Sequence, residues 1–170
     1  IGQTRNDDSR VRYLQQQEFP FVTFGRTKLP EPHAFYDVRH EWITEDSVHR
    51  LSKLGHQRIG MINPPEELNY SGHRLDGFLR GLECCGLCFQ EEMQVSTALS
   101  FEAGRKVLQQ FIELPNPPTA IVSPGVSTTL GILTEMNSAN LILGKDLDLI
   151  AFEGTNYLEF NTPRINAYHS

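Results

Sequence analysis

The stretch from Leu54 to Phe78 most narrowly limits what this chain can fold into. It contains, in order, a glycine after an apolar-periodic run, the apolar residues 59–62, a polar loop and a second apolar-periodic run. A glycine just past such a run is the usual end of a helix. The apolar run 59–62 is too short for a helix, and its polar flanks favour a strand buried on both faces. The stretch therefore predicts a helix, a buried strand and a second helix.

The same alternation continues to the end of the chain. Apolar periodicity and turn residues predict helices over 44–54, 72–85, 100–112 and 127–136, and strands over 59–62, 93–96, 119–123 and 147–152. Strands separated by helices of this length pair in parallel through right-handed crossovers. The predicted fold class is therefore α/β, with a doubly wound parallel sheet. Before residue 44 we expect a short helix starting near Asp8 or Ser9 and short strands at 21–24 and 35–38.

The predicted strands all point the same way, so the loops that follow them should meet at one edge of the sheet. These loops are 63–72, 97–100, 124–127 and 153–156, and open α/β sheets bind small ligands at this edge. Arg74 falls in the predicted first turn of the helix that Ser71 or Gly72 would cap. Its guanidinium would grip an electron-rich ligand group there. Glu153 would accept hydrogen bonds from ligand hydroxyls. The alternative is that both are surface charges that face solvent or pair with each other.

Several classes of function have no support in the sequence. There is no phosphate-binding glycine loop, nucleophile elbow or zinc-protease motif, and the histidines are scattered. We therefore expect neither an enzyme nor a bound cofactor. A net charge of −6 without a Lys/Arg cluster argues against direct binding of nucleic acid by this chain. No apolar run approaches the length of a membrane span, and the first residues lack the pattern of a signal peptide.

The cysteines, Cys84, Cys85 and Cys88, all lie in one short segment. A metal or redox site is one interpretation of such a cluster. However, adjacent cysteines pair badly, and no histidine or second cysteine pair lies at ligand spacing. We therefore predict no metal site, and interpret the cysteines as small apolar side chains near a helix end in a reducing cytosol.

Five segments, in order, resemble the effector-binding domain of the LacI/GalR family of bacterial transcription regulators. The residues Leu54–Ile59 resemble the family's "LGHRRI", and Arg74–Phe78 resemble its "R-x-x-GF". The other matching segments are residues 8–14 with 19–22 and the Gly25-Arg26 turn, 118–122 with 130–131, and 149–153 followed by 162–163. Several positions depart from the pattern. Among them, Glu153 replaces the usual aspartate, and Gly125-Val126 replace a common "ND".

The resemblance implies a two-lobed, periplasmic-binding-protein-like fold that closes on a small molecule. Residues 1–39 would form part of the first lobe and residues 40–170 the second, with further elements of the domain outside this sequence. The implied protein is a cytoplasmic homodimer that binds a sugar-like effector and contacts operator DNA only through a helix-turn-helix absent from this chain. The effector-binding residues would be Arg74, Glu153, Asn69, Tyr70, Leu99, Gly125 and Gly25.

Two other functions remain open at this point. A periplasmic sugar-binding protein of a transport system uses the same fold, and a small α/β enzyme would need a nucleophile or a metal in the cleft. The segments 54–59 and 74–78 favour the regulator over the transport protein. Nothing in the sequence supplies the enzyme's nucleophile.

Overall fold

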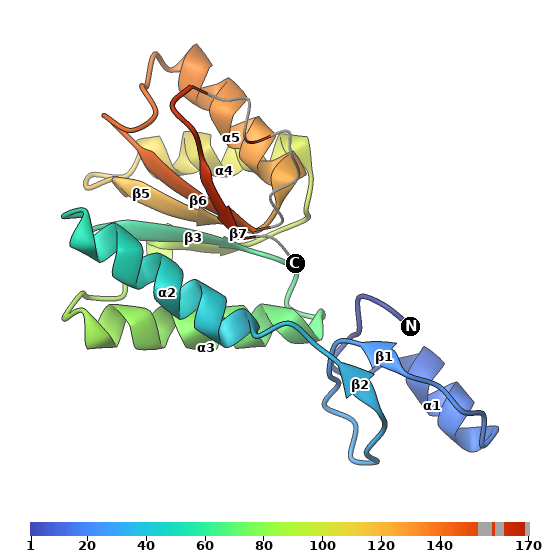
Figure 1. The fold of residues 1–170 in the computed structure, drawn as a ribbon. Coiled ribbons are helices and arrows are strands. Elements are labelled where there is room, and N and C mark those ends of the chain that lie inside the picture. The colour runs from blue at the N-terminus through green and yellow to red at the C-terminus, as the bar shows by residue number, and fades with distance from the viewer. Residues whose placement is uncertain (153–157, 159–161, 169–170) are drawn as a thin grey trace.

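Five parallel strands form the larger sheet of the fold (Figure 1). The structure is a computed structural model and describes residues 1–152, 158 and 162–168. The strand order is β4(Gln94–Ser96), β3(Ile59–Asn63), β5(Ala120–Ser123), β6(Asp148–Phe152) and β7(Asn166–Tyr168). The strand β3 pairs with β4 and β5, and every residue of β3 is buried. The predicted parallel α/β sheet is therefore confirmed.

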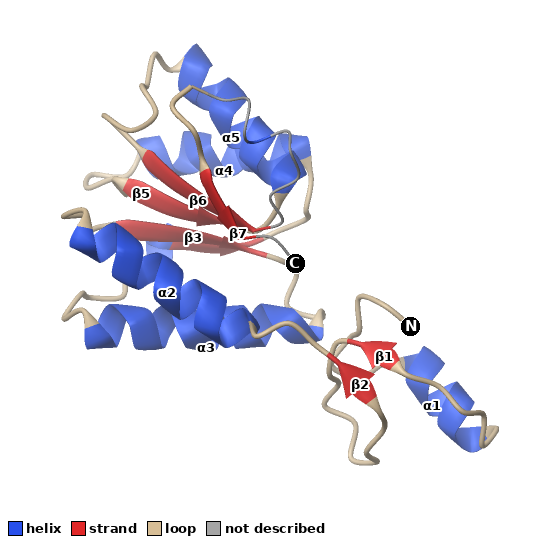
Figure 2. Cartoon of the chain, viewed as in Figure 1, coloured by secondary structure: helices blue, strands red, loops and turns tan. Residues whose placement is uncertain are grey.

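Two pairs of helices cover the two faces of this sheet (Figure 2). The helices α2(His40–Lys53) and α3(Asn69–Cys84) pack on one face, and α4(Phe101–Ile112) and α5(Val126–Ser138) on the other. Side chains alternate along each strand, so Ile62 and Ile121 join the α4–α5 core while Met61 and Val122 join the α2–α3 core. The result is a three-layer sandwich whose strands are buried on both sides.

The N-terminal residues form a separate small unit beside the sheet (Figure 1). The helix α1(Ser9–Gln16) begins as predicted, with the Asp8 carboxylate accepting a hydrogen bond from the Arg10 amide. The strands β1(Thr23–Phe24) and β2(Phe35–Tyr36) pair in parallel. Two backbone hydrogen bonds join this unit to the loop after β3 and to the first residue of the next helix. The Asn6 amide donates to the Glu67 carbonyl at 3.0 Å, and the Asn69 amide donates to the Thr4 carbonyl at 2.9 Å. Its assignment to a separate lobe, residues 1–39, stays a prediction.

The helix α2 begins at His40, four residues before the predicted start at Thr44. Thr44 and Ser47, residue types that often cap helices, stand at the predicted start, but both are buried inside the helix. Their hydroxyls donate to the carbonyls of His40 and Ile43, each at 2.8 Å. A serine or threonine that bonds back to residue i−4 in this way is satisfied within a helix, so neither residue caps α2.

The helix α3 also begins earlier than predicted, at Asn69 with Leu68 as the preceding residue. Ser71 does not cap the helix, because its hydroxyl donates to the Pro64 carbonyl at 2.9 Å and accepts from the Asn63 amide. Arg74 therefore lies in the second turn of α3. The expectation that it sits among the free N–H groups of a helix start is wrong.

Two further expectations change with the structure. The strand β7 was not predicted, because its sequence Asn-Ala-Tyr has no apolar run and it lies at the sheet edge. Cys84 and Cys88 are exposed, so only Cys85 packs against the core as expected of all three cysteines.

Within the described residues, no helix has the length and hydropathy needed to cross a membrane.

Gly77 explains why α2 and α3 pack so closely. A Cβ atom placed on Gly77 would lie 2.0 Å from the Glu41 carbonyl oxygen of α2. A backbone carbonyl of a packed helix cannot move aside without shifting the helix, so only glycine fits this position. This glycine belongs to the "R-x-x-GF" segment, which therefore encodes helix packing as well as an arginine.

Replacing Gly77 with alanine should destabilise the fold, and Gly72 of the same helix supplies the matched control. We expect Gly77→Ala to cost about 1–3 kcal/mol of unfolding free energy through overpacking. A Cβ on Gly72 meets no atom within 4 Å, so Gly72→Ala should gain about 0.5–1 kcal/mol from helix propensity. Urea unfolding of both variants measures the difference, and equal stabilities would contradict the packing argument.

Candidate functional site

A cavity of about 340 Å³ lies where the carboxyl ends of the strands meet the N-terminal unit. Tyr70 and Arg74 come from the helix after β3, Leu99 follows β4, and residues 124–128 follow β5. The volume is within the range of small-molecule sites, and the position is the usual one in open α/β sheets. The residues that line it are Gln3, Phe24, Gly25, Asp37, His40, Tyr70, Arg74, Leu99, Pro124, Gly125, Val126, Ser127 and Thr128.

Arg74 is held firmly in the wall of the cavity, with only 4% of its surface exposed. Its Nη1 donates to the Pro124 carbonyl at 3.0 Å, and its Nε donates to Nδ1 of His40 at 3.3 Å. The guanidinium carbon lies 3.7 Å from the centre of the Phe152 ring and 5.0 Å from that of Tyr70. Cation–π contacts of this kind stabilise a desolvated guanidinium. Arg74 therefore presents a positive charge whose position is fixed.

His40 is kept neutral beside this arginine. Burial, with the nearby Arg74 charge, lowers the pKa of His40 to about 4. The neutral ring stacks on Tyr70 at 5.1 Å between centres and offers the Nδ1 lone pair to Arg74. A protonated ring could not accept that hydrogen bond. His40 thus acts as an acceptor that positions Arg74.

Ion pairs join the N-terminal unit to α2 and α3 next to the cavity. Arg26 lies 2.6 Å from the Asp37 carboxylate through Nε and 3.0 Å from Glu41 through Nη2. Glu41 also lies 2.9 Å from Nδ1 of His73 in α3. Asp37 lines the cavity and is almost completely buried. These charged side chains, all mostly buried, connect the turn after β1 to the starts of two helices.

The first turn of α5 forms another part of the cavity wall and leaves hydrogen-bond donors available. The N–H groups in the first turn of a helix have no acceptor within the helix. The residue before α5, Gly125, has no side chain that could accept from them in its place. The Oγ1 atom of Thr128 is buried and has no hydrogen-bond partner among the described residues. A helix N-terminus of this kind favours an electron-rich ligand atom.

The structure brings most of the predicted site residues together. Arg74, Tyr70, Leu99, Gly125 and Gly25 all line the cavity. Asn69 does not, because its side chain lies between Asn6 at 3.2 Å and His73 at 2.9 Å. Glu153 falls outside the described residues. That any of these side chains binds an effector stays a prediction.

Sequence reasoning missed His40, Asp37 and Thr128. In the sequence, His40 is only one of several scattered histidines, but in the fold it is largely buried against Arg74. A usable signal was present, since the predicted boundary between the two lobes falls directly before His40, and ligand sites often lie where two lobes meet. Thr128 gave no such signal, because a threonine within a helix is ordinarily satisfied by its own backbone.

Comparisons with known proteins agree with this geometry. Residues 48–170 match the family model described as a periplasmic binding protein-like domain. The HTH-type transcriptional regulator AglR of Rhizobium meliloti (strain 1021) is 34% identical over 154 residues, which is 90% of this chain and 43% of that protein. The chain therefore spans less than half the length of this curated relative.

Solved structures show the same fold. A regulatory protein of the LacI family from Chloroflexus aggregans superposes with a TM-score of 0.91 at 27% identity, covering 98% of this chain and 60% of that one. A complex of the transcriptional regulator CelR with cellobiose superposes with a TM-score of 0.90 at 18% identity, covering 100% of this chain and 53% of that one.

The buried, neutral His40 should make stability depend on pH in a defined window. Its pKa in the fold, about 4, lies below the ordinary value of 6.5, so between these values the unfolded chain binds a proton that the native chain does not. His40 therefore costs no stability above pH 6.5, and stability falls as the pH drops toward 4, by an amount on the order of 3 kcal/mol.

We expect His40→Gln to reduce the dependence of the unfolding free energy on pH between 4 and 6.5. The amide oxygen of glutamine can accept the hydrogen bond from Arg74 but does not titrate. Urea unfolding of the wild type and of the variant, at several pH values between 4 and 7, measures this dependence. If the variant keeps the full wild-type slope, His40 is not the group responsible.

Proposed function

The chain belongs to the periplasmic binding protein-like family in the form carried by LacI/GalR transcription regulators, and we propose that its cavity binds a sugar-like effector. The observation that carries the proposal is Arg74, a buried guanidinium fixed in the wall of a cavity of ligand size. A cation is costly to bury, and this one faces a space that an electron-rich ligand can fill.

The remaining walls fit a polyol better than a hydrocarbon. Arg74 and the first turn of α5 supply donors on two sides, while Tyr70, Phe24 and Leu99 supply aromatic and apolar surface. A sugar ring combines hydroxyl oxygens on its edge with apolar C–H faces, so it matches both kinds of wall. A protein of the same fold, CelR, forms a complex with cellobiose, which is consistent with this class of ligand.

In the full-length protein, this domain would act as a non-enzymatic sensor. Effector binding would change how a separate helix-turn-helix domain engages operator DNA, and the protein would act as a homodimer. The relative AglR is named as an HTH-type transcriptional regulator, which favours regulation over transport by a periplasmic binding protein. The acidic chain described here is not expected to bind operator DNA itself.

A thermal-shift screen of neutral sugars, sugar acids and sugar phosphates would identify the ligand class. A ligand present at a hundred times its dissociation constant should add about 2.7 kcal/mol of stability. A screen in which no compound of these classes raises Tm would count against the proposal.

Arg74→Ala should then weaken binding of the ligand that the screen identifies. Loss of charge-assisted hydrogen bonds costs ~1.5–3 kcal/mol of affinity, roughly ten- to a hundredfold. Arg80→Ala is the matched control, since Arg80 lies on the same helix and its side chain is 51% exposed. Calorimetric titration of the three proteins measures the effect, and equal affinities would show that the cavity is not the effector site.

Arg74 is buried, so Arg74→Ala should also lower the stability of the fold. A second variant that does not destabilise the fold is therefore needed to test the site. Gly125→Asp adds a capping carboxylate to the first turn of α5, where a Cβ meets no atom within 4 Å. We expect stability to rise by a few tenths of a kcal/mol while effector affinity falls, because the carboxylate occupies the donors. A variant with unchanged affinity would exclude this helix start from the site.

A further inference from the structure

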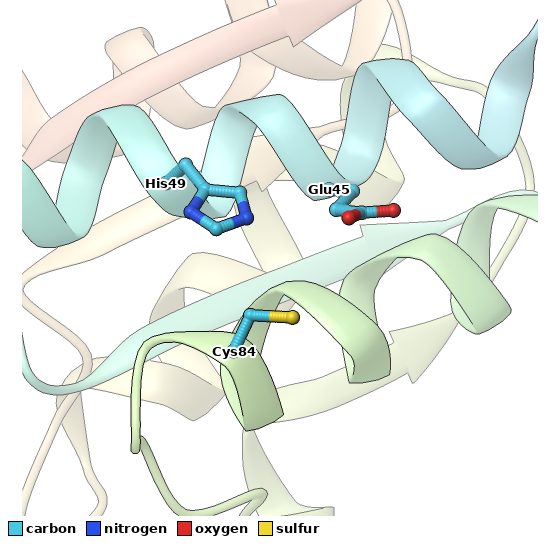
Figure 3. Close-up of side chains that lie close together, drawn as sticks. All are labelled: Glu45, His49 and Cys84. Carbon is cyan, nitrogen blue, oxygen red and sulfur yellow. The ribbon is translucent and has the colours of Figure 1, made fainter.

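A second cluster of polar side chains lies on the outer surface of the α2–α3 pair. Glu45 and His49 are one helical turn apart on α2, and Cys84 is the last residue of α3 (Figure 3). One ligand atom from each, a carboxylate oxygen, an imidazole nitrogen and the thiol sulfur, lie within 4.8 Å of one another. Cys84 is exposed and the other two are half-buried, so the cluster is open to ions in solution.

We propose that Glu45, His49 and Cys84 form a binding site for a divalent cation of the zinc class. Zinc takes sulfur, nitrogen and oxygen ligands together, whereas magnesium and calcium select oxygen alone. A thiolate, a carboxylate and a neutral imidazole balance the two positive charges. Three protein ligands leave the fourth position to water.

The orientation of His49 favours coordination. Its Nδ1 atom lies 3.4 Å from the Cys85 sulfur, and the tautomer with hydrogen on Nδ1 donates to that sulfur. Figure 3 shows the other ring nitrogen on the side of Glu45 and Cys84. In that tautomer this second nitrogen carries the lone pair that a metal needs. Fixing a ligand histidine through its other nitrogen is how metal sites commonly orient the ring.

The helices that carry the ligands are fixed relative to each other close to the site. A Cβ atom on Gly81 of α3 would lie 2.8 Å from Cβ of Val48 and 3.1 Å from the Glu45 carbonyl oxygen. This contact lies one turn before Cys84 and beside both ligands of α2. The separation of the three donors is therefore set by tight backbone packing rather than by loops.

One ion pair competes with the proposed cation. Nε of Arg80 lies 3.2 Å from Oε2 of Glu45, and the two side chains are 51% and 31% exposed. Exposed pairs of this kind are weak, and a carboxylate has a second oxygen for the metal. The competition lowers the affinity of the site but does not block it.

The sequence argument against a metal rested on spacing along the chain, and it counted no histidine near the cysteines. His49 is distant in sequence, and only the packing of α2 against α3 brings it to Cys84. The proposed cation site is formed by different residues from the effector cavity, so either assignment can fail without the other.

Titration with Co²⁺ tests the proposal directly, because a thiolate–cobalt bond absorbs in the near ultraviolet. The purified protein, kept reduced with a phosphine, should bind one Co²⁺ with this absorption, and Zn²⁺ should displace it. Cys84→Ser should abolish the absorption. His49→Gln and Glu45→Gln should each weaken Co²⁺ binding by about 100-fold or more, because even residues that only orient a ligand contribute about 10–100-fold.

Cys88→Ser is the matched control, since Cys88 is exposed in the same segment but lies outside the cluster. It should keep the absorption at full strength. Cys85→Ala should keep the thiolate–cobalt absorption but weaken binding by about tenfold, because it only orients His49. Circular dichroism checks that each variant is folded. Absence of the absorption in the wild type, or its loss in Cys88→Ser but not in Cys84→Ser, overturns the assignment.

Discussion

The parallel direction of the large sheet is the constraint on which the rest of the structure depends. With β3, β4 and β5 running the same way, the loops after them must open at one edge. Residues from three separate segments therefore meet in one cavity, although nothing in their local sequence directs them to each other. Two pairs of helices bury the strands and so hold this arrangement. Where the helices of a pair touch each other, the close packing requires glycine. The site is consequently a property of the whole sheet.

Burial of the Arg74 charge is the most demanding local feature of that site. A guanidinium with 4% exposure loses most of its hydration, and this loss must be offset by interactions in the fold. Two acceptors, the Pro124 carbonyl and neutral His40, and two aromatic faces supply part of the compensation. Those groups come from α2, α3, β6 and the loop after β5, so the charge also ties the layers together.

The sequence predicted the sheet and the side of the cavity because both follow from periodicity and strand direction. It misplaced the starts of α2 and α3, because Thr44 and Ser71 are residue types that often cap helices. In the fold, Thr44 instead bonds back to His40 within α2, and Ser71 bonds to the Pro64 carbonyl. It missed β7, whose pairing depends on β6 rather than on its own apolar content. The positions of His40 beside Arg74 and of His49 beside Cys84 were also missed, because each neighbour is distant in sequence.

The geometry of the cavity also bears on selectivity. Arg74 is held by the protein on several sides, so little side-chain freedom remains to be lost when a ligand arrives. The uncapped N–H groups at the start of α5 would in turn disfavour ligands that offer them no hydrogen-bond acceptor. A ligand that covers them without offering an acceptor leaves buried donors unpaired, which costs more than a missing apolar contact. Discrimination should therefore depend on where the ligand places its oxygens more than on its size.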